Sequence, residues 1–331
     1  MRTQTRNIEN VYIKSAFSSV GRKEGEGPVG SFFDAVYNDD TIGQKSWEMA
    51  ESNLLKTTVS GALTKACKTP DEIELIFAGD LLNQCTASSF ALKELGIPFL
   101  GLYGACSTFT EGLITASMVM SGGFADSTAV CASSHFCSSQ KQYRFPLEYG
   151  EVRTPTSQWT VTGSGCVVLG KDRGICAVKS VTPGKIVDFG ISDANNMGAA
   201  MAPSAADTIY THFNETSLSP DYYDFIVTGD LASVGSDILI ELLQKRGIDI
   251  SKNHLDCGKM IFDADAQSVA SGGSGCGCVA SVFCGYFIKK FLSGELNRIL
   301  LVATGALMSP SSVLVGEPIS GIAHGVSIER V

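Results

Sequence analysis

The stretch that decides the fold is GACSTFTEGLITASMVMSGGFADSTAVCASS, residues 104–134. It aligns with GCGCVASVFCGYFIKKFLSGELNRILLVATGA, residues 275–306, so that Cys106 falls on Cys278. In both stretches a turn of small residues precedes a long helical pattern, a glycine ends the helix, and a continuous apolar run follows. Such apolar runs are typical of parallel strands that are buried on both faces.

A second repeated pattern extends the duplication. DEIELIFAGDLLN (71–83) resembles DYYDFIVTGDLASVG (221–235), since each has a polar start, a β-rich apolar run and then Gly-Asp-Leu. Two such halves predict duplicated βαβ layers with helices buried between two sheets. We place the halves at 1–172 and 173–331, and because no long linker lies between them we expect one compact unit.

Length, charge and cysteine usage narrow the function classes. The 331 residues allow one large two-lobed domain or two domains, and the net charge of −9 argues against broad nucleic-acid binding. Eleven cysteines without paired spacing favour a reducing compartment, and the CGC at 276–278 lacks the partners of a zinc site. We find no secretion signal and no apolar run of the roughly 20 residues that a membrane span needs.

Cys106 is the first candidate for chemistry. The pattern places it at a strand-to-helix junction, where free N–H groups and the helix dipole lower a thiol pKa and hold an oxyanion. Nucleophilic cysteines often lie at such junctions. The alternative interpretation is a small residue that packs a tight turn, which is how we interpret Cys278.

The duplicated pattern together with GACS resembles the thiolase superfamily, which includes thiolases and β-ketoacyl synthases. The resemblance covers nearly the whole chain, including TPTSQWTVTGSGCVVLG (154–170) and the glycine-rich ISGIAHGVSIERV (319–331). It implies a thiolase-like, duplicated α/β fold of five layers, αβαβα, with two mixed sheets. It also implies a homodimer formed through the strand near STAVCAS (127–133).

The bases of the condensing members of this superfamily are missing here. Where those members carry a histidine after the strand FIVTG, this chain has GDLASVG with Asp230, and where ketoacyl synthases carry an asparagine it has SGGSGCGC (271–278). The Gly-His-Pro pattern of thiolases is absent as well. A cysteine alone would accept an acyl group but condense poorly, so we predict that the chain is not an enzyme.

A closer resemblance rests on SSHFCSSQKQYRFPLEYGEVRTPTSQWTVTGSG (133–165), DANNMGAAMAPSAADTI (193–209) and PISGIAHG (318–325). These runs resemble the stage V sporulation protein AD family, thiolase-fold proteins of spore-forming bacteria. The resemblance implies binding of dipicolinic acid (pyridine-2,6-dicarboxylate) for its uptake into the developing spore, with the membrane-embedded SpoVA proteins as partners. It implies a peripheral place on the inner spore membrane, without a transmembrane segment of its own.

The predicted ligand site consists of polar and cationic groups around Cys106, which stands at the nucleophile position of the condensing enzymes. Dipicolinate carries two carboxylates that are ionised at neutral pH, and arginine is preferred for planar contact with carboxylates. The predicted ligand-binding residues are Cys106, His135, Ser138, Arg144, Arg153 and His324. The alternatives are solvated surface charge for the arginines and local hydrogen bonding for the two histidines. We predict no cofactor and no metal site; calcium is a candidate to enter with the ligand and bridge it to a carboxylate such as Asp230.

Two other functions stay open. One is a β-ketoacyl-synthase-III-like acyltransferase with Cys106 as nucleophile and His135 or His324 as an unusual base. The other is a structural assembly subunit with an empty pocket. MGAAMAPSAAD (197–207) supplies small and flexible apolar residues that suit either a pocket wall or helix packing.

Overall fold

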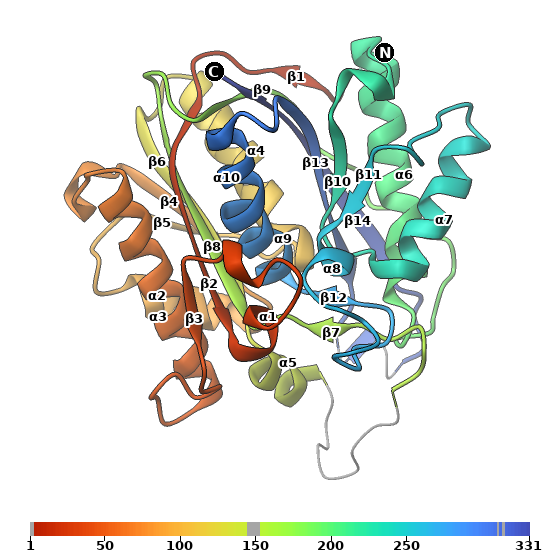
Figure 1. Cartoon of the computed structure of the whole chain (residues 1–331), viewed down its shortest axis with the longest axis horizontal. Helices are drawn as coiled ribbons and strands as arrows, with labels where there is room; N and C mark the ends of the chain where they lie inside the picture. Colours follow the sequence, from red (N-terminus) through yellow and green to blue (C-terminus); the bar gives the residue numbers. More distant parts are fainter. Residues whose placement is uncertain (1–2, 144–152, 310, 313–314) are drawn as a thin grey trace.

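The first half of the chain contributes one set of strands to the fold. The computed structural model describes residues 3–143, 153–309, 311–312 and 315–331 (Figure 1). The first-half strands pair in the order β2 (Tyr12–Gly21), β8 (Gly163–Gly170), β6 (Ser127–Ser134), β4 (Leu75–Gly79) and β5 (Phe99–Gly101). The first three of these are antiparallel to their neighbours, whereas β6, β4 and β5 run parallel.

The second half repeats this arrangement. Its strands pair in the order β9 (Cys176–Thr182), β14 (Ser320–Arg330), β13 (Arg298–Leu307), β10 (Phe225–Thr228) and β11 (His254–Asp256). Again the first three are antiparallel, and β13, β10 and β11 run parallel. The shared order agrees with the duplication that the repeated sequence patterns indicate. Residue 172 falls between β8 and β9, and a domain division there stays a prediction.

Hydrogen bonds join the two sets of strands into one sheet. Tyr12 and Ile13 of β2 pair with Ala177 and Cys176 of β9, so backbone pairing continues across the middle of the molecule. The expectation of two separate sheets is corrected in this respect. The short strands β1 (Arg6–Asn7) and β3 (Ala35–Tyr37) add to β9 and β2, and β7 (Trp159–Thr160) pairs with β12 (Gly273–Ser274) in a separate ribbon.

Helices occupy three layers, which confirms the five-layer αβαβα arrangement. Between the two sets of strands lie α4 (Thr108–Ser121) and a segment formed by α9 (Cys276–Val282), the π-helical η7 (Phe283–Phe287) and α10 (Ile288–Ser293) (Figure 1). The outer layers are α2 (Trp47–Lys65) with α3 (Thr86–Leu92), and α6 (Met197–Thr216) with α7 (Ala232–Gln244). The short helices are α1 (Arg22–Gly25), α5 (Phe136–Tyr143), α8 (Cys257–Met260), η1 (Gly30–Phe32), η2 (Pro70–Glu72), η3 (Asn83–Cys85), η4 (Ala105–Ser107) and η6 (Pro220–Tyr222).

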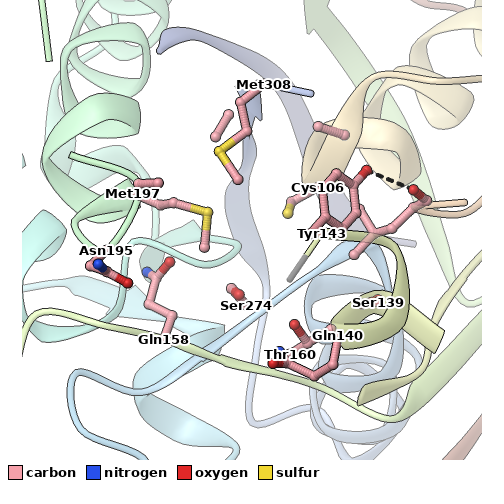
Figure 2. A pocket seen from close by; sticks show the side chains of 14 residues that line it. Cys106, Ser139, Gln140, Tyr143, Gln158, Thr160, Asn195, Met197, Ser274 and Met308 are labelled. Atoms are coloured by element: carbon pink, nitrogen blue, oxygen red, sulfur yellow. Dashed lines mark hydrogen bonds between the residues drawn. The ribbon is translucent and has the colours of Figure 1, made fainter. Parts of the chain in front are cut away.

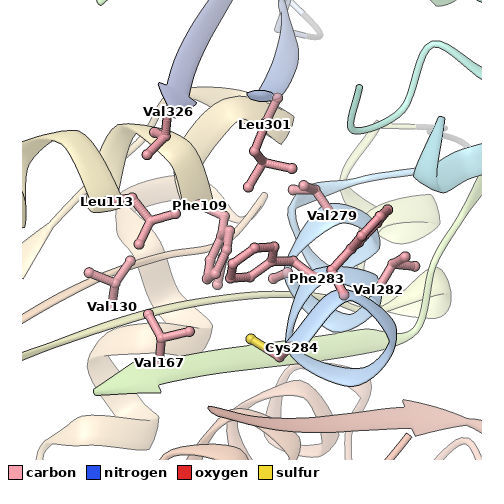
Figure 3. Close-up of a cluster of buried hydrophobic side chains, with 14 of the residues drawn as sticks. Phe109, Leu113, Val130, Val167, Val279, Val282, Phe283, Cys284, Leu301 and Val326 are labelled. Atoms are coloured by element: carbon pink, nitrogen blue, oxygen red, sulfur yellow. The ribbon is translucent and has the colours of Figure 1, made fainter. Parts of the chain in front are cut away.

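The buried middle layer packs the two halves against each other. Phe109 of α4 and Phe283 of η7 have ring centroids 5.8 Å apart, and Leu113, Val167 and Leu301 lie around them (Figure 3). All five side chains are fully buried. Because the two phenylalanines come from different halves, this cluster fixes the positions of the turns that precede α4 and α9.

The middle layer also holds a segment that satisfies the length and composition of a membrane span. Cys276–Ser293 has a mean hydropathy of 1.3, and 72% of it is buried inside the structure. The expectation that no stretch is long and apolar enough to span a membrane is therefore wrong for this segment. In the structure it packs as a core helix.

The predicted dimer strand lies inside the sheet. β6 is hydrogen-bonded to β4 on one side and to β8 on the other, and all its residues are buried. β6 therefore has no free edge in the described structure and cannot itself pair with a second copy, and an interface near it stays a prediction. The outer strand on this side is β5, where Leu100 is 47% exposed. Homodimer formation itself stays a prediction.

Candidate functional site

A cavity of about 220 Å³ lies where the two halves meet. Its wall comes from η4, α5 and β7 of the first half and from the start of α6, β12 and the end of β13 in the second (Figure 2). Cys106, Tyr143, Met197 and Met308 face one another across it. The polar part of the wall consists largely of hydroxyl and amide side chains, namely Ser139, Gln140, Gln158, Thr160, Asn195 and Ser274.

Cys106 lies in a tight turn directly before α4, as the sequence predicts. Ala105 has a φ of +52°, in the left-handed region that disfavours residues with a side chain. The Ser107 hydroxyl donates to the carbonyl oxygen of Gly104, and the Thr108 hydroxyl donates to that of Ala105, both at 2.6 Å. These local bonds hold the strained turn that brings the cysteine to the cavity wall.

The environment of Cys106 favours the neutral thiol. Burial raises its pKa well above the ordinary value, and the Asp230 carboxyl and Cys276 raise it further, whereas the Gly275 N–H lowers it. The expectation of a low pKa is therefore wrong. The physical reason is that α4 begins only at Thr108 and that the thiol is buried beside an acidic group.

Asp230 is the acidic group beside this thiol. Its Oδ1 accepts a hydrogen bond from the Thr304 hydroxyl at 2.5 Å, and its Oδ2 lies 3.4 Å from the Gly275 N–H. Burial raises the pKa of Asp230 to about 7, although the bonds from Thr304 and Cys106 act in the opposite direction. Asp230 and Cys106 therefore form a pair that carries little charge below neutral pH.

The two copies of the Gly-Asp turn have different tasks. Asp80, in the first copy, accepts hydrogen bonds from the Leu82 N–H at 2.8 Å and from the Ser88 hydroxyl at 2.6 Å. In the second half Asp256 holds the corresponding turn by accepting two backbone N–H groups at 2.9 Å each. Because Asp256 holds this turn, the Asp230 carboxyl is left to bond Thr304 and lies beside the Cys106 thiol, behind the cavity wall.

The two predicted histidines are hydrogen-bonded to the backbone. His135 Nε2 donates to the carbonyl oxygen of Asp40 at 2.7 Å, and its Nδ1 accepts the Cys137 N–H at 3.1 Å. His324 Nδ1 accepts the Gly184 N–H at 3.1 Å. Burial lowers the pKa of both, that of His324 to about 4, so both rings are neutral at pH 7. These contacts match the alternative of local hydrogen bonding, and ligand contact stays a prediction.

The other predicted residues also have structural contacts. The Ser138 hydroxyl donates to the Glu51 carboxyl at 2.6 Å. The Arg153 guanidinium lies 4.4 Å from the ring centroid of Trp159, and its Nη1 is 3.4 Å from the carbonyl oxygen of the cavity residue Gln158. Arg144 lies outside the described residues. Of the predicted set, Cys106 is the residue found in the cavity wall of the described structure.

Sequence reasoning missed several residues of the wall, above all Tyr143, Gln158 and Met308. Gln158 belongs to the QWTVTGSG run, which we used only as a mark of family resemblance. The stretch 197–207 suits either a pocket wall or helix packing, and the structure shows both, since Met197 lines the cavity and Met201 packs in the core. Within the described ranges no group of three or more histidine, cysteine, aspartate or glutamate side chains could hold a metal ion.

Replacing Asn196 by alanine is expected to lower the free energy of unfolding by about 0.5–2 kcal/mol. Asn196 begins α6 by accepting the Ala199 N–H at 3.3 Å, and its neighbours Asn195 and Met197 line the cavity. Chemical denaturation of both proteins measures the difference. Asn196→Asp, which keeps an acceptor at the cap, serves as the control, and an equal loss in both variants would contradict the capping role.

Comparison with known proteins decides the family. The family model described as Stage V sporulation protein AD (SpoVAD) matches residues 2–329. This chain belongs to the SpoVAD family. The Stage V sporulation protein AD of Bacillus subtilis (strain 168) is 45% identical over 320 residues, which cover 97% of this chain and 94% of that protein. The resemblance seen in the sequence is thereby confirmed, and a role in sporulation follows for this member.

Solved structures share the fold of this SpoVAD-family chain at low sequence identity. The tetronic acid condensing enzyme AbyA1 has a TM-score of 0.59 at 17% identity, covering 96% of this chain and 99% of that one. The 3-oxoacyl-[acyl-carrier-protein] synthase III of Aquifex aeolicus VF5 has a TM-score of 0.55 at 12% identity, covering 99% and 100%. These likenesses establish the thiolase-like fold and no more.

Proposed function

We propose that this SpoVAD-family protein binds dipicolinic acid in the cavity at Cys106 and does not catalyse condensation. The observation that carries the proposal is the pairing of Cys106 with a buried carboxyl group. A condensing cysteine reacts as the thiolate, and here burial and the Asp230 carboxyl both raise the pKa of the Cys106 thiol. The nucleophile position is thus kept as part of a binding cavity.

The size and polarity of the cavity support a small planar acid as ligand. Its volume of about 220 Å³ lies below the roughly 300–1,000 Å³ typical of sites for drug-sized ligands. Met197 and Met308 offer soft apolar contacts for a ring, and the hydroxyl and amide groups of the wall can hydrogen-bond carboxyl oxygens. A long acyl chain would need more room than this cavity provides.

We further propose that the protein acts beside the membrane-embedded SpoVA proteins, as a peripheral component at the inner spore membrane. The support for this step is the resemblance of its whole sequence to the SpoVAD family. In this role the protein would capture dipicolinic acid in the cavity at Cys106 before it is translocated.

One observation favours a second function. Cys106 lies on a strained turn at the cavity wall, with Ala105 at a φ of +52°, and such strain is common at nucleophilic sites. The alternative is a β-ketoacyl-synthase-III-like acyltransferase that uses Cys106. It requires a mass increase of Cys106 after incubation with an acyl-CoA, whereas the binding function requires none.

Titration calorimetry with dipicolinate is expected to show saturable binding at one site per chain. Ala194→Trp, which places a large ring at the cavity wall, is expected to weaken binding by at least about tenfold, because the ligand and the ring compete for the same volume. Cys106→Ala is expected to weaken it by a smaller factor. Cys67→Ala is the matched control, since Cys67 is an exposed cysteine and should leave binding unchanged. Absence of binding to the unaltered protein, or acyl transfer from acyl-CoA at Cys106, would reject the proposed function.

A further inference from the structure

Gln158 is a buried side chain whose orientation is fixed. It is 3% exposed, lines the cavity, and its Nε2 donates to the carbonyl oxygen of Asp230 at 2.7 Å. If the amide were turned over, Oε1 would face that carbonyl oxygen and two acceptors would meet. The Arg153 guanidinium also donates to the backbone carbonyl oxygen of Gln158 at 3.4 Å. The position of Oε1 is therefore set by the protein before any ligand binds.

The wall holds two buried side-chain atoms that have no hydrogen-bond partner among the described residues. These atoms are Gln158 Oε1 and Ser139 Oγ. Figure 2 shows both residues at the cavity, Ser139 on the side of α5 and Gln158 across from it. An amide oxygen only accepts hydrogen bonds, whereas a hydroxyl can also donate. Burial without a partner costs each group free energy, which a ligand with matching groups recovers.

The neighbouring groups leave Gln158 Oε1 and Ser139 Oγ without a hydrogen bond, which a ligand can supply. The Tyr143 hydroxyl, the phenol of the wall, donates to the carbonyl oxygen of Leu81 at 2.7 Å. The wall contains no lysine, arginine or histidine among the described residues; its ionisable groups are the Cys106 thiol and the Tyr143 phenol, with Asp230 behind them. Desolvation in such a wall disfavours a second negative charge on the ligand.

We propose that Gln158 determines ligand specificity: the bound ligand donates a hydrogen bond to Gln158 Oε1 and accepts one from the Ser139 hydroxyl. This inference rests on the proposed function, which places a small planar acid in the cavity. For a pyridine dicarboxylic acid it means that one carboxyl group is bound as the un-ionised acid, with its O–H toward Gln158, and the other as the carboxylate. A planar monoacid with a permanent N–H donor would satisfy the same two atoms.

The test compares two monoanionic analogues at one fixed pH, 6-carbamoylpyridine-2-carboxylate and the monomethyl ester of dipicolinate. Both carry one carboxylate, but only the amide presents a donor. The native protein is expected to bind the amide at least about tenfold more tightly than the ester, because the ester leaves the Gln158 acceptor unpaired. Gln158→Met is expected to reduce this ratio to within about twofold. Ser139→Ala is expected to weaken both analogues and to keep the ratio.

A second glutamine provides the matched control. Gln142 Nε2 also donates to a backbone carbonyl, that of Leu81 at 2.8 Å, but its Oε1 is already bonded by the Asn83 N–H at 3.0 Å. Gln142→Met should therefore keep the preference for the amide. An equal affinity of the native protein for both analogues, or a preference that persists in Gln158→Met, overturns the inference. If dipicolinate binds without such a preference, only the role of Gln158 fails; if the amide binds and dipicolinate does not, only the proposed ligand fails; if none binds, both fail.

Discussion

Replacing Glu51 by glutamine is expected to stabilise the protein increasingly as the pH rises from 5 to 8. Glu51 lies on α2, is fully buried, and accepts hydrogen bonds from the hydroxyls of Ser133 at 3.1 Å and Ser138 at 2.6 Å. Burial raises its pKa to about 8, and the nearby charge of Asp80 adds to this, against the effect of the two serine bonds. The folded protein therefore keeps Glu51 protonated at pH values where the unfolded chain does not.

The sign of the effect follows from linkage. The unfolded chain loses the Glu51 proton near the ordinary pKa of 4.5, whereas the folded protein holds it to about 8. Between these values the free energy of unfolding of the native protein falls by about 1.4 kcal/mol for each pH unit from this one group. Glutamine resembles the protonated carboxyl and does not titrate, so the advantage of the variant grows through this window and is absent below it.

Chemical denaturation at pH 5, 6, 7 and 8 measures the difference between the two proteins. Glu241→Gln is the matched control, since Glu241 is exposed and pairs with Lys245 four residues later on α7. Its effect should be small and should not rise with pH. A difference between Glu51→Gln and the native protein that stays constant from pH 5 to pH 8 would show that Glu51 is ionised in the folded state.

The layered fold could be predicted because its signals are local and occur twice. The pattern of residues 104–134 and its copy at 275–306 each give a turn, a buried helix and a buried strand, and the structure places α4 and α9 in the middle layer. The joining of β2 to β9 could not be predicted, because a one-chain sequence shows which residues are apolar but not which strand edges meet. For the same reason the sequence does not show that the STAVCAS strand, near which we expect a dimer interface, lies inside the sheet.

The site could be predicted only in part. Cys106 and the acidic residue at 230 were found because each stands at a position with a defined role in a known pattern. His135 and Ser138 follow the end of β6, and their side chains bond to the carbonyl oxygen of Asp40 and to the Glu51 carboxyl. Gln158 shows the limit most clearly, since its importance depends on one hydrogen bond to the backbone of residue 230 in the other half. No local pattern encodes such a contact.

Alkylation of Cys106 by iodoacetamide at pH 8 is expected to be slow in the native protein and at least about tenfold faster in Asp230→Asn. The thiolate is the reactive form, and each unit by which the thiol pKa falls increases its amount about tenfold while the thiol is mostly protonated. Asp230, with a pKa of about 7, is mostly ionised at pH 8 and opposes a second negative charge on the adjacent sulfur. Asparagine removes that charge and keeps the shape of the side chain.

Peptide mass spectrometry after timed quenching follows each cysteine separately. Cys67 is exposed and provides an internal reference whose rate should be the same in both proteins. Glu24→Gln is the matched protein control: Glu24 is buried and has a pKa of about 7 like Asp230, but its carboxyl accepts the Thr162 N–H. This variant should leave the rate at Cys106 unchanged. If native Cys106 instead reacted as fast as Cys67, a thiolate would already be present beside Asp230. Such a thiolate is the nucleophile that an acyltransferase needs, so this result would favour the acyltransferase function over the binding function.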